Sequence, residues 1–218
     1  MRPELLSDAI QDYLKEIYKL AGEVDRVTTN AVARRLGVSA PSVTSMLKKL
    51  AALGLVVHEP YRGATLTAAG ELIAVEVVRH HRLLELYLMQ TLGMSIENVH
   101  AEADRLEHAL SEELEARIDA ALGFPTPDPH GDPIPDAKLR IDEPALRALD
   151  ALGPGERATI RRVPDDSGDL RLLSDLALLP GSEVELVDGG RGGGLVTVAS
   201  GGAEHVIERE LAGRIGVA

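Results

Sequence analysis

Apolar residues near the start of the chain recur at every third or fourth position. Between residues 5 and 20 this spacing predicts an amphipathic helix with one buried face. The residues that define that face are Leu6, Ile10, Tyr13, Leu14, Ile17 and Tyr18.

Two shorter helical segments follow, AVARRL and SVTSMLKKLAALG, and Gly37 separates them. Thr29 or Asn30 suits the cap of the first segment, and Pro41 suits the first turn of the second. The pattern predicts a helix-turn-helix. After Gly54 the runs LVVHE and ATLT flank the turn Pro60-Tyr61-Arg62-Gly63, which predicts a hairpin and hence a winged helix.

Long helix-periodic stretches then replace the short elements. Residues 68–92 and 95–122 contain more apolar residues than the small winged domain could cover. They therefore favour a helical dimerisation module, in which a second chain covers the remaining apolar surface. Residues 124–137 contain five prolines and indicate a linker or an extended crossing segment. Beyond it RATIRRV, SEVELVD, GLVTVAS and EHVIERE, with the helical turn LRLLSDLALL among them, predict a small β-barrel.

These elements predict a mainly α fold with small β parts. The expected domains are a winged helix-turn-helix over residues 1–72, a helical metal-binding and dimerisation domain over 73–140, and a β-barrel over 151–218. No run approaches the roughly 18 apolar residues of a membrane span. The N-terminus MRPELLSDAI is too acidic and polar for a secretory signal, so we expect no membrane partner and a cytoplasmic location.

The net charge of −12 argues at first against nucleic acid, but the charge is unevenly distributed. Residues 1–62 carry +2, residues 63–140 carry −8 and the remainder carries −6. A compact basic patch within residues 28–63 therefore favours DNA as the partner. The basic residues of this patch are Arg34, Arg35, Lys48, Lys49 and Arg62.

Histidine and carboxylate residues cluster on the two long helices. His81 and Glu85 are four residues apart, and His100, Asp104, Glu107 and His108 fall at i, i+4, i+7 and i+8, so each set is expected on one helix face. The chain has no cysteine, so a metal ion would need oxygen and imidazole ligands. Solvated helix faces also contain such residues, and His58, His80, His130 and His205 are assigned structural or surface roles.

The order of these motifs resembles the diphtheria toxin repressor family of metal-dependent regulators. The resemblance covers nearly the whole chain, and its most specific parts are HRLLE, the H-x₃-D-x₂-EH pattern and GDPIP in register. It implies a metal-dependent, DNA-binding transcriptional regulator, expected to repress metal-uptake genes and not to be an enzyme. LPGSEVELVD and the Gly-rich hairpin after it resemble the SH3-like (FeoA-like) domain of that family, which implies possible intramolecular contacts of that domain.

The resemblance also implies metal ligands. The primary, activating site would consist of Asp12, Asp104, Glu107 and His108, and the ancillary site of His81, Glu85 and His100. Asp165 and Asp166 are further ancillary candidates from the SH3-like domain. Methionine and cysteine replace Asp12 and Asp104 in the iron-selective branch, so this chain is more similar to the manganese-responsive branch. One relative of that branch has a glutamate where this chain has Lys15.

Hard ligands independently favour Mn²⁺, with Fe²⁺ as the alternative and Zn²⁺, Co²⁺ or Ni²⁺ expected to substitute in vitro. Asp12 is the only proposed primary ligand outside the long helices, so an ion there would position the winged domains of a homodimer on palindromic operator DNA. The residues expected near bases are Ser39, Pro41, Ser42, Thr44 and Ser45, and Arg34, Arg35, Lys48, Lys49 and Arg62 are expected to bind phosphates.

Two other classes of function remain open on the sequence. A metal-dependent hydrolase would use the His and Glu cluster to activate water, but neither H-E-x-x-H nor a phosphate-binding loop ending in Gly-Lys-Ser/Thr is present. A metal-independent winged-helix regulator would bind an organic ligand, and an aromatic content of 2% makes a stacking pocket less favourable.

Overall fold

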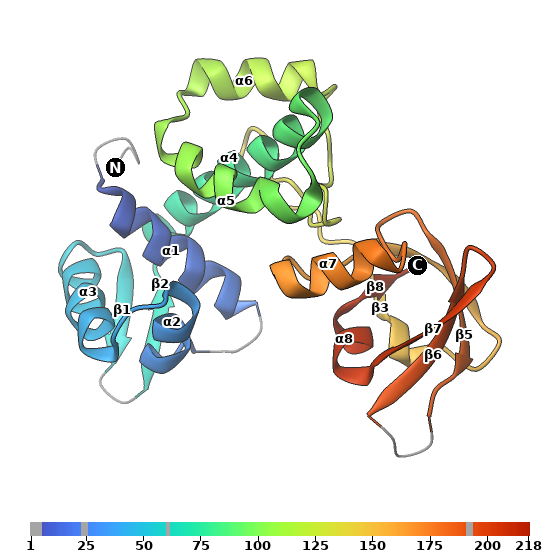
Figure 1. Cartoon of the computed structure of the whole chain (residues 1–218). Helices are drawn as coiled ribbons and strands as arrows, with labels where there is room; N and C mark the ends of the chain where they lie inside the picture. Colours follow the sequence, from blue (N-terminus) through green and yellow to red (C-terminus); the bar gives the residue numbers. More distant parts are fainter. Residues whose placement is uncertain (1–5, 23–25, 60–61, 191–193) are drawn as a thin grey trace. The chain divides into compact units, whose positions relative to one another are not determined.

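The computed structural model describes residues 6–22, 26–59, 62–190 and 194–218 (Figure 1). The chain divides into two compact units. The first unit comprises residues 1–81, 105–112 and 135–140, and the second comprises 82–104, 113–134 and 141–218. None of the helices in the described ranges is long and apolar enough to span a membrane.

The first unit contains the predicted helix-turn-helix. Its helices are α1 (Asp8–Ala21), α2 (Thr29–Leu36) and α3 (Ala40–Ala52). The cap of α2 is Thr28 rather than Thr29 or Asn30, because Thr28 has an extended backbone and its hydroxyl accepts from the Ala31 N–H at 3.2 Å. Gly37 ends α2 in the left-handed conformation at φ 64°, as the sequence predicted.

The predicted wing is a two-stranded hairpin. Strand β1 (Val56–Glu59) pairs antiparallel with β2 (Gly63–Leu66), next to α3 in the blue part of Figure 1. Pro60 and Tyr61 of the predicted turn lie outside the described residues. The core beneath the wing consists of buried apolar residues from α1, α2, α3 and the hairpin, among them Leu14, Ile17, Val32, Leu47, Leu50 and Val56.

The first long helix, α4 (Ala68–Leu92), has the predicted bounds. The prediction of one helix over 95–122 is wrong, because the segment contains α5 (Ile96–Leu106), a 3₁₀ turn η2 (Glu107–Ala109) and α6 (Glu112–Ala121). Leu110 is extended with ψ 117° and interrupts the helix. Ser111 and the two glutamates after it are typical of a new helix N-terminus, since a hydroxyl and negative charge stabilise the first turn.

The second unit contains the predicted β-barrel, drawn in orange and red in Figure 1. Its strand order is β3-β8-β4-β5-β6-β7, and every pair is antiparallel. The strands are β3 (Arg147–Ala148), β4 (Arg157–Arg162), β5 (Glu183–Asp188), β6 (Leu195–Ser200), β7 (Ala203–Glu208) and β8 (Gly216–Val217). The helical elements are η3 (Leu149–Ala151), α7 (Ser167–Asp175) and α8 (Arg209–Arg214). Residues 191–193 of the predicted Gly-rich hairpin lie outside the described residues.

Residues 124–134 of the proline-rich segment belong to the second unit, and residues 135–137 to the first. Pro127 and Pro133 form an antiparallel bridge, and the Arg82 guanidinium donates to the Pro133 carbonyl at 2.6 Å. Gly131 has φ 90°, and a Cβ there would lie 1.8 Å from the carbonyl oxygen of Arg161 on β4. This segment therefore lies directly against the barrel, and only glycine permits the approach.

Candidate metal centre and DNA-binding surface

A carboxylate from α1 meets two residues of the turn η2 in the first unit. His108 Nε2 lies 2.9 Å from Asp12 Oδ1 and 3.6 Å from Glu107 Oε1. Asp12, Glu107 and His108 thus offer three ligand atoms that all lie within 4.8 Å of one another. We call these three residues the α1–η2 cluster. The 3₁₀ turn matters because it places the adjacent residues Glu107 and His108 together beside α1.

Glu107 is the most buried member of the α1–η2 cluster. Its side chain has no exposed surface, and both of its oxygens have close partners. Lys15 Nζ lies 2.6 Å from Oε1, and His81 Nδ1 lies 2.6 Å from Oε2. A buried carboxylate needs such partners, since burial without them is costly. The Lys15 contact was not foreseen from the sequence, which gave no distance between α1 and the long helices.

His108 is held by hydrogen bonds on both ring nitrogens. Gln11 Nε2 donates to the Leu6 carbonyl at 3.3 Å, which directs the Gln11 amide oxygen toward His108. His108 Nδ1 donates to that oxygen at 3.1 Å, so Nε2 is the ring nitrogen directed at Asp12. The Asp12 contact raises the pKa of His108, with Glu107 acting in the same direction and burial opposing it. Gln11 is a positioning residue that the sequence analysis missed.

His80, expected to be a surface or core residue, is buried and contacts the turn η2. Its side chain is buried, and Nδ1 donates to the backbone carbonyl of Glu107 at 3.1 Å. This bond ties α4 to the backbone of the 3₁₀ turn. His80 therefore fixes the backbone from which two ligand candidates project.

A second group of histidines and carboxylates lies in the second unit. His100 Nδ1 on α5 lies 3.0 Å from Glu85 Oε1 on α4, and His100 Nε2 lies 3.6 Å from Asp104 Oδ2. The structure therefore brings together Glu85 and His100 of the predicted ancillary set. It places Asp104, predicted as a primary ligand, beside His100. His81 lies one turn before Glu85 on α4 and belongs to the first unit.

His130, which the sequence analysis assigned to a structural role, also lies beside Glu85. Its Nε2 is 3.5 Å from Glu85 Oε1, its side chain is 1% exposed, and within the described part of the chain neither ring nitrogen has a hydrogen-bond partner. Burial alone lowers the pKa of His130, but the charges of Glu85, Asp128 and Asp165 raise it above its usual value. We call Glu85, His100, Asp128 and His130 the Glu85 cluster.

Asp128 is the buried carboxylate of this group. Its Oδ1 accepts from the N–H groups of His130 and Asp132 at 2.9 Å each, and its Oδ2 lies 3.6 Å from Arg82 Nε. Burial raises the pKa of Asp128 to about 7, and the charges of Glu85 and Asp132 act in the same direction. The sequence DPHGDP places an aspartate two residues before a histidine, which could have indicated these two residues. The expected ligands were spaced three or four residues apart on a helix, and this segment is a loop.

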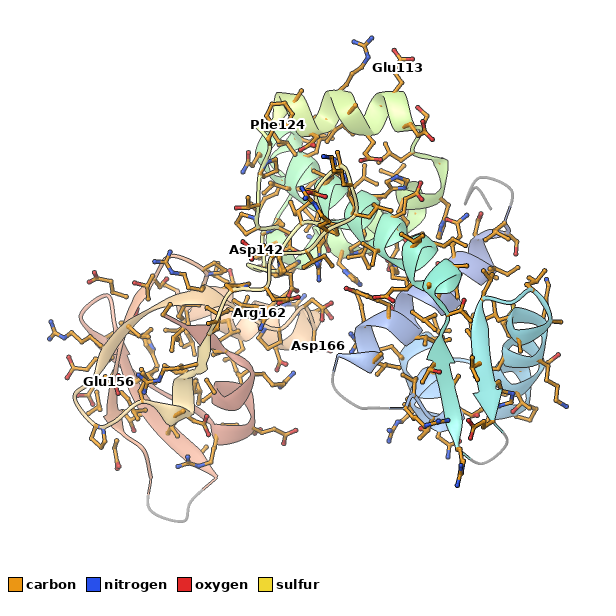
Figure 2. The ribbon with its side chains drawn as sticks, turned by 180° about the vertical axis from the view of Figure 1, so that it is seen from behind. Glu113, Phe124, Asp142, Glu156, Arg162 and Asp166 are labelled. Carbon is orange, nitrogen blue, oxygen red and sulfur yellow. The ribbon has the colours of Figure 1, made fainter. Side chains whose placement is uncertain are left out.

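The two aspartates predicted from the SH3-like domain differ in their surroundings. Asp166 caps α7, with Oδ1 accepting from the N–H groups of Gly168 and Asp169 at 2.9 and 3.2 Å (Figure 2). Its exposed carboxylate is thus engaged at a helix start. Asp165 is half-buried, and its charge acts on His130. Asp165 is therefore the better placed of the two for a role in the Glu85 cluster.

Both clusters fit a hard divalent cation. Each combines carboxylate oxygens with imidazole nitrogens, the ligand types that suit Mn²⁺, Fe²⁺ and Zn²⁺. The Glu85 cluster also concentrates negative charge in buried surroundings, since the Glu85 and Asp128 side chains are both buried, and a cation there would offset repulsion and desolvation. Among the described residues the two buried ring nitrogens of His130 make no hydrogen bond, and only Glu85 Oε1 lies near one of them, at 3.5 Å from Nε2. Buried polar atoms normally have hydrogen-bond partners, so this histidine favours a bound ligand.

The polar face of α3 is arranged as a surface for DNA. Ser39 caps the helix by accepting from the Ser42 N–H at 3.3 Å, and Pro41 lies in the first turn. The Thr44 hydroxyl donates to the Ala40 carbonyl at 3.0 Å, so its methyl group is the part available to a partner. The exposed residues of this face are Pro41, Ser42, Ser45, Lys48 and Lys49.

Arg34, Arg35 and Arg62, three of the predicted phosphate contacts, are exposed, and the last two have acidic neighbours. Arg35 Nε lies 3.0 Å from Glu16 Oε2 on α1, and Arg62 Nη1 lies 3.4 Å from Glu59 Oε2. The Arg62 pair is exposed and weak. The Glu16 carboxylate is largely covered, with 11% of its side chain exposed, so Arg35 is linked to α1.

Comparison with known protein families gives three consecutive matches. Residues 5–64 match the iron dependent repressor N-terminal DNA binding domain, and residues 67–136 match the iron dependent repressor metal binding and dimerisation domain. Residues 147–218 match the FeoA domain.

Individual relatives match over most of their length. The diphtheria toxin repressor of Corynebacterium efficiens is 34% identical, over 84% of each chain. The iron-dependent repressor IdeR of Mycobacterium tuberculosis is 33% identical over 95% of each chain. Among solved structures, a manganese-dependent transcriptional repressor in complex with manganese is 40% identical, with a TM-score of 0.89, and covers 96% of this chain and 99% of its own.

Proposed function

The chain belongs to the iron-dependent repressor family, and from this premise we propose that it is a repressor whose binding to operator DNA depends on Mn²⁺ at the α1–η2 cluster. The fold is that of the family, with an N-terminal helix-turn-helix, a helical dimerisation region and an SH3-like FeoA domain. Its relatives are metal-dependent transcriptional repressors, and we infer no enzymatic activity. The domain bounds that we propose are 1–72, 73–140 and 151–218.

The proposal depends on one contact. His108 Nε2 lies 2.9 Å from Asp12 Oδ1, although the two residues are 96 positions apart. Asp12 belongs to α1, which packs against α2 of the helix-turn-helix, whereas His108 belongs to η2. A divalent ion supplies the positive charge that attracts Asp12, Glu107 and the His108 nitrogen at the same time. These ligands therefore link the position of α1 to occupancy of the cluster.

We prefer Mn²⁺ to Fe²⁺ because carboxylates are hard ligands and the chain has no thiol. Zn²⁺, Co²⁺ and Ni²⁺ have higher intrinsic affinity for such ligands and are expected to substitute in vitro. Asp104 remains a proposed fourth ligand of the primary site. We propose the Glu85 cluster as an ancillary site, with His81 and Asp165 as further candidate ligands and Asp166 as a helix cap.

The proposed DNA contacts follow the surface of α3. Ser39, Pro41, Ser42, Thr44 and Ser45 would approach bases, while Arg34, Lys48, Lys49 and Arg62 would contact phosphates. Short hydroxyl side chains offer few hydrogen bonds, so contacts with methyl groups and the shape of the DNA are expected to contribute to specificity. Two copies related by a twofold axis would require a palindromic site.

Apolar side chains exposed in the second unit support self-association. Three large apolar side chains on or just after helices of the dimerisation region are exposed. They are Leu92 (61%), Leu114 (49%) and Phe124 (70%). Figure 2 labels Phe124 just past the end of α6. Covering exposed apolar side chains with another chain removes apolar surface from water, which favours association. We propose that they contribute to a homodimer interface.

The test measures DNA binding of the full chain at controlled metal content. A DNA pool selected by the Mn²⁺-loaded protein from a random library is titrated by fluorescence anisotropy with Mn²⁺, Fe²⁺ or Zn²⁺ under anaerobic conditions. We expect tight binding with Mn²⁺ and a loss of at least about tenfold after EDTA treatment. Equal binding by the metal-free protein would reject the proposal.

The Asp12→Asn variant tests Asp12 as a metal ligand, since it keeps the size of the side chain and removes its charge. It should remain dimeric by sedimentation and lose the response to Mn²⁺. A normal response in this variant would exclude Asp12 from the activating site.

A further inference from the structure

Lys15 is a buried cation within the α1–η2 cluster. Its side chain is 4% exposed, and its ammonium lies 2.6 Å from Oε1 of Glu107, whose side chain has no exposed surface. Lys15 follows Asp12 by three residues on α1, so both side chains lie on nearly the same face of that helix. Lysine is rarely buried unless it is paired, and this pair is between α1 and η2.

The Lys15 ammonium shares a carboxylate oxygen with a proposed metal ligand. His108 Nε2 lies 3.6 Å from the same Glu107 Oε1 that binds Lys15. The other oxygen, Oε2, lies 2.6 Å from His81 Nδ1. An ion bound by Asp12, Glu107 and His108 would therefore be close to a fixed positive charge.

We propose that Lys15 acts as a tethered cation whose positive charge limits the α1–η2 cluster to one divalent cation. The inference rests on the proposed function, because it presumes that this cluster binds Mn²⁺. It adds a regulatory role for Lys15. The ammonium lowers the affinity of the cluster for a cation by repulsion.

Electrostatic repulsion between Lys15 and a bound cation determines the direction of each effect. Two like charges a few ångströms apart repel strongly even at the effective dielectric constant of about 20 that describes protein sites. Removing the Lys15 charge should therefore tighten Mn²⁺ binding by about tenfold or more. Replacing it with a carboxylate would add a ligand and negative charge, which would permit a second ion.

The experiment measures Mn²⁺ binding to the full chain by calorimetry and by electron paramagnetic resonance. The phase of binding that disappears in Asp12→Asn is assigned to the α1–η2 cluster. We expect one Mn²⁺ in this phase for the natural chain, one ion bound at least about tenfold tighter in Lys15→Met and Lys15→Gln, and two magnetically coupled ions in Lys15→Glu.

Lys15→Arg and Lys19→Met are the controls. The first keeps the charge at the same position, and the second removes an equal charge one helical turn away on α1. Both should bind Mn²⁺ as the natural chain does. Lys15→Gln retains a donor for Glu107, so it tests the charge even if Lys15→Met unfolds.

Unchanged or weaker affinity in a folded Lys15→Gln would overturn the role of Lys15 while leaving the metal site intact. If Asp12→Asn removes no phase of Mn²⁺ binding, the metal site itself is wrong, and the inference is wrong with it. The two failures are therefore distinguishable.

Discussion

Arg35 on α2 donates to Glu16 on α1, with Arg35 Nε 3.0 Å from Glu16 Oε2. Glu16 directly follows Lys15, whose side chain contacts Glu107 of η2. Contacts from two adjacent residues of α1 therefore reach both η2 and the helix-turn-helix. We infer that Arg35 serves mainly to transmit the position of α1, and less to bind phosphate.

Glu16→Gln tests this link. The substitution keeps the shape of the side chain and weakens the ion pair, so we expect unchanged Mn²⁺ affinity and operator affinity reduced by roughly three- to tenfold at saturating Mn²⁺. Calorimetry and fluorescence anisotropy measure the two quantities. Tighter binding to DNA would instead assign Arg35 to a phosphate contact, because the variant removes the Glu16 charge beside the guanidinium.

Gln11→Leu should weaken Mn²⁺ binding at the α1–η2 cluster. The Gln11 amide oxygen accepts from His108 Nδ1 at 3.1 Å, and outer partners of this kind typically contribute about 10- to 100-fold to metal affinity. Gln11→Glu retains an acceptor and should bind Mn²⁺ at least as tightly as the natural chain. Equal affinities in both variants would show that Gln11 does not orient the imidazole.

Asp128→Asn should change the pH dependence of stability in the metal-free protein. Burial raises the pKa of Asp128 from 3.8 to about 7, so its contribution to folding is fully present below about pH 4 and is lost as the pH rises through 7. Asparagine keeps the oxygen that accepts from His130 and Asp132 and has no charge to bury. As the pH rises from 5 to 8, the free energy of unfolding of the natural chain should therefore fall by about 3 kcal/mol relative to that of the variant. Urea unfolding in EDTA at the two pH values measures this difference, and an equal offset at both would contradict it.

Gly131→Ala should destabilise the second unit by about 3 kcal/mol or more. The added Cβ would lie 1.8 Å from the Arg161 carbonyl oxygen, and the residue has φ 90°, so strain and steric clash combine. Gly155→Ala is the control, because Gly155 has φ 79° and no atom near its Cβ position. It should lose only about 1 kcal/mol. Thermal unfolding of both variants gives the comparison, and equal losses would mean that the segment moves aside easily.

Lys48→Ala should weaken binding to every DNA sequence. Lys48 is exposed on α3, and loss of one phosphate contact lowers the slope of log affinity against log salt by about 0.9. Ser45→Ala, on the same helix, should reduce binding to the selected operator more than binding to unrelated DNA. Anisotropy titrations at several salt concentrations separate the two patterns. A loss for Lys48→Ala that is confined to the operator would rule out a phosphate role.

Elements with local signals were predictable from the sequence. The period of apolar residues gave the bounds of α4, and Gly37 ended α2 as expected, because both depend on neighbours within one or two helical turns. The break after Leu106 was missed because the apolar period continues past it. Ser111 with Glu112 and Glu113 was the local signal for a new helix.

The candidate site was harder to predict from the sequence, because it depends on contacts between residues that are distant in the chain. Asp12, Glu107 and His108 were expected to meet only through the family resemblance, and no spacing rule connects residues nearly a hundred positions apart. His130 and Gln11 were missed for the same reason. A rule based on helical spacing finds ligands on one helix and overlooks those that a loop or an outer hydrogen bond supplies.

His80 on α4 forms a hydrogen bond with the Glu107 carbonyl, so the position of the Glu107 side chain depends on the number of residues in the chain just before η2. One inserted residue between Arg105 and Glu107 would rotate the carboxylate by about 100° about the helix axis and move it away from Lys15. Insertions in the exposed loop between β6 and β7 would leave that geometry unchanged. Length variation among natural homologues should therefore be absent from the short stretch between α5 and η2 and common at the edge of the barrel.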